Sequence, residues 1–301
     1  MFILMSCTTS TSPINISKSL VKNICDKKCA FSYKYSNSTC NVTNNAYYIS
    51  IPYDENSSPE VEYNNMKIKA TNIQIFQPSL NKYEGKQLDG EILIYHTGTD
   101  TSVILCIPIV KSSLKTDGSQ LLETLFSNTA TRTPNTDDAA TINFSNFNIN
   151  SLIPKGSFYT YEATLPIPPC NGKHNFIVFS GFVSIDTKTF ENMITTIGPH
   201  SFETKNGPQL FLNPKGAFYG TRTQDMEDDI YIECNPVGED GEILYSKNKS
   251  LNLSLPSEFN ISDIMKSPYI LFILSIMGLT IVYKGSQVAW NIFNKKKLNN
   301  K

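Results

Sequence analysis

The feature that most constrains the fold is an unbroken apolar run of eight residues, VILCIPIV, at positions 103–110. A strand with one face in water alternates apolar and polar residues, whereas a strand that is apolar throughout has to be buried on both faces. We therefore expect a central strand here, in a sheet that is covered on both sides. Pro108 is expected at the end of this strand or at a bulge, because proline cannot donate a hydrogen bond to a neighbouring strand.

Other segments rich in β-branched and aromatic residues indicate further strands. These strands are expected at residues 47–51, 67–76, 91–96 and 176–179. Helical patterns are fewer: leucines recur at helical spacing within residues 119–128, and Asp186 is a good N-cap for a helix that ends at Ile197. A long polar loop is expected over residues 129–141. Together these patterns predict a mainly β protein of the α+β class.

The charge distribution is uneven along the chain. Residues 1–267 hold 21 basic and 27 acidic residues, a net charge of −6, and the other five basic residues follow the last acidic one, Asp263. A mildly acidic body argues against nucleic-acid binding.

The C-terminal part has the pattern of a membrane anchor. Residues 268–283 form a run without a charge, PYILFILSIMGLTIVY, near the lower limit for a span. If the Lys284 side chain reaches back to the membrane surface and the helix continues to Trp290, about 20 residues are available, which is enough to span a bilayer. We predict a transmembrane helix at residues 268–290, an acidic and polar stalk at 236–267 and a basic tail at 291–301.

The orientation of this anchor stays open on the sequence alone. The first residues, MFILM, lack a basic segment and are too short for a secretory signal, which favours a domain left on the cytosolic side. The lysines at 295–297 favour the opposite orientation, because positive residues prefer the cytoplasmic side. Eight N-x-S/T sequons do not decide the matter, since the Asn, Ser and Thr content alone accounts for roughly six. They lie at Asn15, Asn37, Asn41, Asn56, Asn143, Asn248, Asn252 and Asn260.

The seven cysteines do not form the paired motifs of a zinc finger. An odd number leaves at least one free thiol if the others pair, and spacing does not fix the connectivity. The cysteines are Cys7, Cys25, Cys29, Cys40, Cys106, Cys170 and Cys234.

Three stretches, in the right order, resemble the α-class carbonic anhydrase family. Residues 12–16 (SPINI) are similar to the opening of the family, and residues 158–170 (FYTYEATLPIPPC) to its Y-x-Y-x-G-S-L-T-T-P-P-C segment. Between them, residues 74–96 align without a gap with the stretch that the family writes H-F-H-T-P-S-E-H-T…G-K…E-x-H-L-V-H. The resemblance covers roughly residues 12–222 and implies a domain at 12–235 after an N-terminal segment at 1–11. It implies a large, central, twisted and mostly antiparallel sheet with short peripheral helices.

In this register the three zinc-binding histidines of the family fall on Gln74, Phe76 and Leu93. Phenyl and isobutyl groups have no lone pair, and an amide is a poor zinc ligand. Without zinc, nothing lowers the pKa of water from 15.7 toward about 7, so the hydroxide nucleophile does not form at neutral pH. The resemblance therefore implies a domain without metal, cofactor or hydratase activity. The alternative of an active enzyme needs a metal site built from Gln74, His96, Cys106 or an acid.

Other family positions also depart from the pattern. The proton-shuttle histidine matches Tyr47, the hydroxyl gatekeeper matches Pro166 and its acidic partner matches Leu80. Glu91 matches an acid that orients a ligand histidine in the family, but here a structural role is expected. The resemblance also implies a disulfide between Cys170 and a cysteine near the N-terminus, with Cys7 the best partner and Cys25, Cys29 and Cys40 as alternatives.

A zinc-free anhydrase-like domain ahead of a C-terminal anchor also resembles the cell-surface-binding proteins of poxviruses. That likeness implies a virion-envelope protein that attaches particles to a host glycosaminoglycan or a protein receptor. The alternative is a structural virion membrane protein that serves assembly or partner docking. A sulfated glycan requires clustered cations, although a solvated surface explains the same lysines. The candidates are Lys67, Lys69, Lys82, Lys86, Lys111 and Lys115, with a second cluster at Lys18, Lys22, Lys27 and Lys28.

Overall fold

The computed structural model describes residues 7, 9–25, 28–53, 60–167 and 172–220. The predicted stalk, transmembrane helix and basic tail lie outside these residues, as does the end of the predicted domain. Within the described ranges, no helix is long and apolar enough to cross a membrane.

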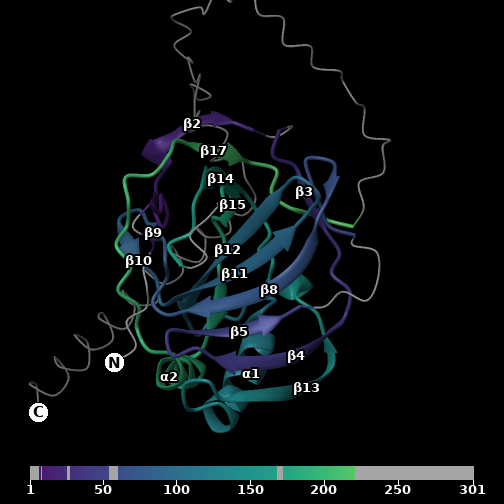
Figure 1. Cartoon of the computed structure of the whole chain (residues 1–301), viewed down its shortest axis with the longest axis vertical. Coiled ribbons are helices and arrows are strands. Elements are labelled where there is room, and N and C mark those ends of the chain that lie inside the picture. The colour runs from purple at the N-terminus through teal and green to yellow at the C-terminus, as the bar shows by residue number, and fades with distance from the viewer. Residues whose placement is uncertain (1–6, 8, 26–27, 54–59, 168–171, 221–301) are drawn as a thin grey trace, which may run out of the picture. The chain divides into compact units, whose positions relative to one another are not determined.

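One eleven-stranded sheet organises the domain (Figure 1). Neighbouring strands are antiparallel except at the β12–β15, β12–β16 and β17–β2 pairs, which confirms a mostly antiparallel sheet. In spatial order the path runs through β13 (Ala139–Phe147), β4 (Ser38–Asn44), β5 (Tyr48–Pro52), β8 (Lys69–Phe76), β11 (Gly90–Thr97), β12 (Ser102–Lys111), β15 (His174–Phe179), β14 (Phe158–Ala163), β17 (Leu210–Asn213) and β2 (Val21–Ile24), with β16 (Val183–Ile185) beside β12.

The apolar run at 103–110 lies in β12, near the middle of this sheet, and is buried on both faces as expected. Alternate residues enter two apolar clusters, one on each face. Val103, Leu105 and Ile107 belong to the larger cluster, while Ile104 and Cys106 belong to the other. Pro108 lies where β12 changes its neighbour from β15, paired up to Cys106, to β16, paired from Ile109 onward. Its missing N–H therefore falls at a break in pairing, inside the strand and not at its end.

Two small sheets flank the large one. The first is β1 (Asn15–Ile16), β9 (Lys82–Tyr83) and β10 (Lys86–Gln87), and the second is β18 (Phe218–Tyr219), β3 (Phe31–Tyr33), β6 (Glu62–Tyr63) and β7 (Met66–Lys67). Glu84 and Gly85 connect β9 to β10 with φ of 48° and 78°, the left-handed conformation that a tight two-residue hairpin requires.

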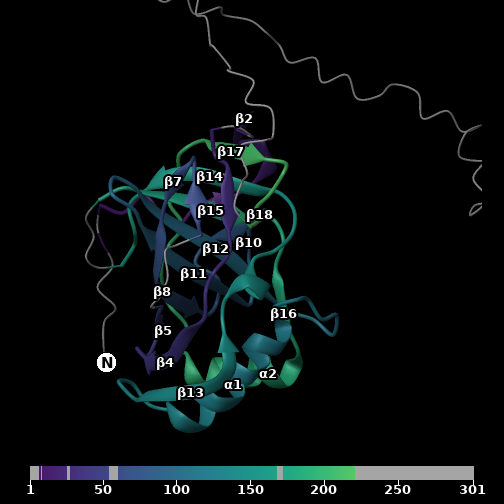
Figure 2. The ribbon, with the colours of Figure 1, turned by 90° about the vertical axis from the view of Figure 1, so that its right-hand side faces the viewer.

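Two helices, α1 (Ser119–Arg132) and α2 (Thr187–Thr196), lie together near β4 and β13 (Figures 1 and 2). Asp186 caps α2 as predicted, because its carboxylate accepts from the Thr189 N–H at 2.7 Å. Two short 3₁₀ turns, Lys18–Leu20 and Asn150–Leu152, complete the described elements.

The prediction of a long polar loop over residues 129–141 is wrong for most of that range. Helix α1 continues to Arg132, and β13 begins at Ala139. Polar residues fit the helix end because their hydroxyls bond back to the preceding turn: Thr133 donates to the Thr129 carbonyl at 3.1 Å. The start of β13 lacks the large apolar residues of a buried strand, because β13 is the edge of the sheet and Ala139 and Thr141 are exposed.

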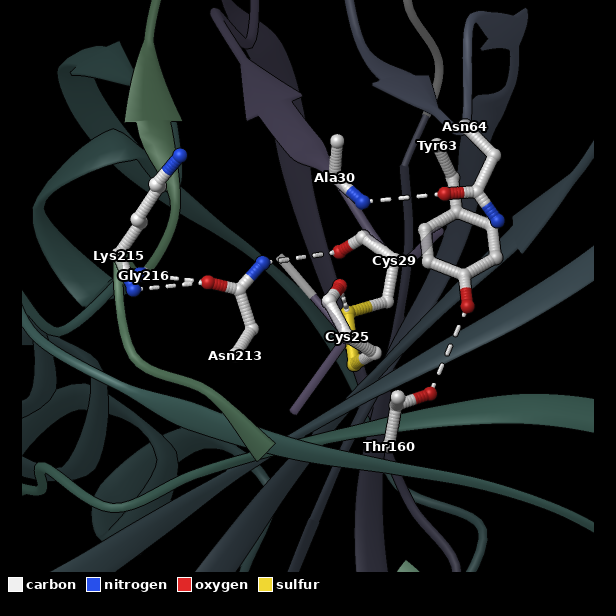
Figure 3. Close-up of a disulfide and its surroundings, with 9 residues drawn as sticks. All are labelled: Cys25, Cys29, Ala30, Tyr63, Asn64, Thr160, Asn213, Lys215 and Gly216. Atoms are coloured by element: carbon white, nitrogen blue, oxygen red, sulfur yellow. Dashed lines mark hydrogen bonds between the residues drawn. A yellow bond between two sulfur atoms is a disulfide. The ribbon is translucent and has the colours of Figure 1, made fainter. Parts of the chain in front are cut away.

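A disulfide between Cys25 and Cys29 closes the turn between β2 and β3 (Figure 3). Asn213, at the end of β17, holds this turn through its side-chain N–H₂, which donates to the Cys29 carbonyl at 3.2 Å. Its Oδ1 accepts from the backbone N–H groups of Lys215 and Gly216 at 2.9 and 3.0 Å. The disulfide is therefore anchored to the far end of the large sheet.

Asn44 provides a test of how the helices are held to the sheet. Its buried side chain donates to the Thr133 carbonyl at 2.8 Å and to the Thr196 carbonyl at 3.1 Å, which satisfies the C-terminal ends of both helices. Asn44→Ala leaves these carbonyls without that donor, so we expect the free energy of unfolding in urea to fall by about 2–4 kcal/mol. Asn45→Ala, the neighbouring half-buried residue, should cost less than about 1 kcal/mol. Equal losses in the two variants would contradict this role.

Candidate functional site

The three positions that correspond to the zinc ligands of the resembled family lie on adjacent strands and on one face of the sheet. Gln74 of β8 is the direct cross-strand neighbour of Leu93 of β11, and Phe76 lies two residues further along β8, opposite Glu91. Residues two apart in a strand point to the same side. The backbone therefore brings these three side chains together.

Apolar packing fills this face. Phe76 and Leu93 are 0% and 1% exposed, and both belong to the smaller of the two apolar clusters, which we call the second cluster. Tyr48 packs on Phe76 with ring centroids 5.0 Å apart, and the amide oxygen of Gln74 accepts from the Tyr95 hydroxyl at 2.7 Å. The second cluster comprises Ile14, Ile16, Phe76, Leu80, Leu93, Ile104, Cys106, Tyr159, Tyr161, Ala163, Leu165, Ile167, Phe176, Val178 and Leu210.

The space left beside Leu93 is small. A cavity of about 10 Å³ lies between Leu93, Cys106 and Phe176 and is also lined by Leu80 and Pro166. That volume is at the lower limit for one water molecule, and its lining is largely apolar. The positions matched to the gatekeeper and its acidic partner, Pro166 and Leu80, thus close the cavity and supply no polar group.

The histidines use their ring nitrogens within the protein. His96 donates from Nδ1 to the Ile94 carbonyl at 3.1 Å, because a carbonyl only accepts, and its Nε2 accepts from the Tyr35 hydroxyl at 2.8 Å. In His200, Nε2 donates to the Pro78 carbonyl at 2.9 Å and Nδ1 accepts from the Phe202 N–H at 3.2 Å.

The alternative metal set of Gln74, His96 and Cys106 is not assembled. His96 packs against Phe31 and Tyr35 of the larger cluster, whereas Cys106 belongs to the second cluster. Burial raises the pKa of the Cys106 thiol well above its usual range, which keeps it a neutral, poor ligand. Among the described residues, no group of three or more His, Cys, Asp or Glu side chains is placed to hold a metal ion.

Glu91 is fully buried and accepts three hydrogen bonds. The Asn81 backbone N–H donates to Oε2 at 2.8 Å, and the Asn81 side chain and the Tyr83 hydroxyl donate to Oε1 at 2.9 and 2.6 Å. Asn81 in turn accepts from the Ile14 N–H at 3.0 Å. Burial raises the pKa of Glu91, and these donors oppose that shift. Glu91 thus ties the N-terminal segment and the β8–β9 connection to the sheet, which agrees with the expected structural role. The sequence pattern did not identify Asn81 and Tyr83 as its partners.

The candidate lysines separate into three places. Lys67 ends β7 and Lys69 begins β8, whereas Lys82 and Lys86 lie on the β9–β10 hairpin beyond the other end of β8 (Figure 1). The first and last of the eight residues of β8 are seven steps of about 3.3 Å apart, so the two ends lie roughly 23 Å from each other. Lys111 lies over the Phe190 ring at 4.7 Å, and Lys115 pairs with Glu123 at 3.0 Å.

The structure adds two lysines to the hairpin pair. Lys18 follows β1, which pairs with β9, and its backbone N–H donates to Glu84 of the hairpin turn at 3.0 Å. Lys205 is bridged to Ile14, and its N–H donates to the Pro13 carbonyl at 2.7 Å. We call Lys18, Lys82, Lys86 and Lys205 the hairpin lysines. Sequence reasoning placed Lys18 in another cluster and missed Lys205, because only tertiary pairing brings these segments together.

Cys7 forms a disulfide, and its N–H donates to the Pro166 carbonyl at 2.9 Å, four residues before Cys170. Cys170 lies outside the described residues, so the Cys7–Cys170 pairing stays a prediction. Cys25 and Cys29, the alternative partners, pair with each other, and Cys40 is a free buried thiol.

The fold and this face of the sheet define the class of the protein. Residues 4–207, more than half of the chain, match the family described as eukaryotic-type carbonic anhydrase. The chain therefore belongs to the carbonic anhydrase family.

Solved structures share this fold at low identity. The Photobacterium profundum α-carbonic anhydrase aligns with a TM-score of 0.57 at 15% identity, over 68% of this chain and 89% of that one. The Thermovibrio ammonificans enzyme, solved with the inhibitor sulfanilamide, gives 0.54 at 18%, over 68% and 87%. Dioscorin, solved with ascorbate, gives 0.56 at 14%, over 69% and 87%. At these identities the likeness concerns the fold alone. No curated protein matches the chain.

The buried carboxylate predicts a large cost for a small change. In Glu91→Gln one acceptor oxygen becomes an N–H₂ donor that faces the Asn81 and Tyr83 donors, so we expect the free energy of unfolding to fall by about 2–4 kcal/mol. Glu162→Gln, at the exposed pair with Lys173, is the matched control and should change it by less than about 1 kcal/mol. Urea unfolding followed by near-ultraviolet circular dichroism measures both, and a neutral Glu91→Gln would contradict the role of this network.

His96 predicts a pH dependence of stability. Burial lowers its pKa from 6.5 to about 4, so the folded protein keeps this ring neutral while the unfolded chain protonates it. Above pH 6.5 the neutral ring costs the folded protein nothing relative to the unfolded chain. As the pH falls from 6.5 toward 4, the free energy of unfolding decreases by about 3 kcal/mol, because only the unfolded chain takes up the proton. His96→Gln should lack this loss. Unfolding curves at pH 7, 5.5 and 4.5 test it, and parallel pH profiles for the two proteins would contradict the assignment.

Proposed function

We propose that the chain is a zinc-free carbonic anhydrase-like protein, anchored in a virion envelope, that attaches to a sulfated glycosaminoglycan on the host cell. The observation that carries the first part is the burial of Phe76 and Leu93 at two of the three ligand positions. A hydratase needs a metal-bound hydroxide and room for its substrate. Apolar side chains and a cavity of about 10 Å³ support neither.

Attachment through charge is supported by the hairpin lysines. They come from three segments that meet at the small β1–β9–β10 sheet, and three of them are exposed while Lys82 is half-buried. The acid of this hairpin, Glu84, accepts from the Ser17 hydroxyl at 2.9 Å and from the Lys18 N–H at 3.0 Å. These bonds lower the pKa of Glu84 and hold its carboxylate. The charge of Lys18 also acts on this carboxylate. Among the described residues no ion pair involves Lys82, Lys86 or Lys205, so their ammonium groups can meet sulfate groups.

The C-terminal sequence supports the membrane and virion parts of the proposal. The apolar stretch at 268–290 has the length and flanking lysines of a single-pass anchor. A zinc-free anhydrase-like domain ahead of such an anchor resembles the poxvirus cell-surface-binding proteins.

Retention of the full chain, in detergent, on immobilised heparin and chondroitin sulfate tests the proposal. We expect salt-sensitive binding that weakens about 10-fold or more in Lys82→Ala/Lys86→Ala, because two charge-assisted contacts are lost. Lys67→Ala/Lys69→Ala removes the same charge at the other end of β8 and should change binding little.

Other outcomes would replace the proposal. Equal losses in the two double variants would indicate attraction by overall charge, not a site at the hairpin. Absence of retention together with absence of binding to cells would favour the structural role in virion assembly. Absence of retention with cell binding that survives glycosaminoglycan removal would indicate a protein receptor.

A further inference from the structure

One edge of the large sheet is formed by strands that contain no charged residue and no proline. β13 is the edge strand, with the sequence AATINFSNF, and β4 beside it reads STCNVTN. Folded proteins usually protect such edges with charges, prolines or covering segments. In β13, the Thr141 carbonyl accepts a hydrogen bond from Nη1 of Arg132 in α1 at 3.2 Å. The edge is at the bottom of the domain in Figures 1 and 2.

The outward side chains of β4 are hydroxyls and amides, and β13 adds the Thr141 hydroxyl and the Ala139 methyl group. Cys40, Val42 and Ile142 point inward and are buried, and the residues between them alternate to the other face. That outer face carries Thr39, Asn41, Thr43 and Thr141, all exposed or half-exposed, and Asn143 and Ser145 are exposed where the pairing of β13 with β4 becomes irregular after Ile142.

Among the residues that the structure describes, the exposed sequons gather on this edge. Composition explains how many sequons occur, but not why the exposed ones, Asn37, Asn41 and Asn143, lie on one strand pair and the turn beside it. Asn15 is half-buried, its Oδ1 accepts from the Gly85 N–H at 2.8 Å, and the sequon hydroxyl of Ser17 bonds Glu84. Asn56 lies outside the described residues.

Asn41 and Asn143 can carry a substituent without loss of the fold. Asn41 accepts from the Thr141 hydroxyl through Oδ1 at 2.7 Å, and this oxygen is untouched when Nδ2 is substituted. Its Nδ2 donates one long, exposed bond to the Thr39 hydroxyl at 3.4 Å, and a substituted amide keeps one N–H for it. Asn143 is exposed on the edge strand itself. Asn37 differs, because its Nδ2 donates to Asn146 at 3.1 Å and its Oδ1 accepts from Asn148 at 3.2 Å.

Two further observations favour a domain on the lumenal side of the membrane. The domain contains the Cys25–Cys29 disulfide and a second disulfide that involves Cys7, and such bonds form in oxidising compartments. The lysines at 295–297, beyond the predicted span, favour the cytoplasmic side and place the domain opposite.

We propose that the β4–β13 edge is a site of N-linked glycosylation, with Asn41 and Asn143 as the acceptors. The donor is an oligosaccharide linked to a lipid through a diphosphate. Asparagine Nδ2 forms a bond to C1 of the first sugar, the bond from C1 to the diphosphate oxygen breaks, the lipid diphosphate leaves with the electron pair, and the amide loses one proton. The attached glycan is bulky and hydrated. It blocks the addition of another strand to β13.

The test is the full chain expressed in cultured animal cells, with peptide N-glycosidase digestion in ¹⁸O water and peptide mapping by mass spectrometry. We expect ¹⁸O-labelled aspartate at positions 41 and 143. Asn41→Gln and Asn143→Gln should each remove one glycan from the electrophoretic ladder, and Ser145→Ala should remove the same glycan as Asn143→Gln. Asn146→Gln, an exposed asparagine outside a sequon on the same strand, should leave the ladder unchanged.

An unmodified Asn41 and Asn143 in the full chain would overturn the proposal, whatever the state of the sequons at Asn248, Asn252 and Asn260. Modification of those C-terminal sequons with unmodified Asn41 and Asn143 would show that the chain enters the lumen but that this edge is not an acceptor. The result does not depend on the proposed attachment function, since peptide mapping reads the modification directly.

Discussion

The structure depends on central strands that are buried on both faces. In β11, β12 and β15 successive residues enter opposite apolar clusters, so the sheet has two cores and no solvent-facing side at its centre. Burial of each large aliphatic side chain contributes roughly 1.5–3 kcal/mol. In this protein the second core occupies the face where the resembled enzymes hold zinc. Phe76 and Leu93 therefore stabilise the fold at the positions where ligands would be needed for catalysis.

The remaining polar groups near this core serve the fold. Glu91 is completely buried, yet each of its oxygens accepts a hydrogen bond from Asn81 in the β8–β9 connection. His96 and His200 are held neutral by burial, and both ring nitrogens of each are bonded. A buried charge or polar group is tolerated only when it is paired in this way. These residues can persist in the sequence without catalysis, because their loss would leave buried partners unsatisfied.

The sequence predicted the central strand, the N-cap at Asp186 and the absence of histidine at the ligand positions, because each depends on local pattern or residue identity. It did not predict the edge strand β13, where an exposed polar strand lacks the periodic signal of a buried one. Nor could it separate Lys67 from Lys82 or bring Lys205 near Lys18. Those relations follow from pairing between residues far apart in the chain, which spacing does not encode.

In this protein an apolar core occupies the face of the sheet that carries the zinc-ligand positions of the family. Elemental analysis of the full chain, purified with excess zinc and then freed of unbound metal, tests it most directly alongside a CO₂ hydration assay. We expect far less than one zinc per chain and hydration at the uncatalysed rate. One zinc per chain with catalysed hydration would contradict the roles given to Gln74, Phe76 and Leu93.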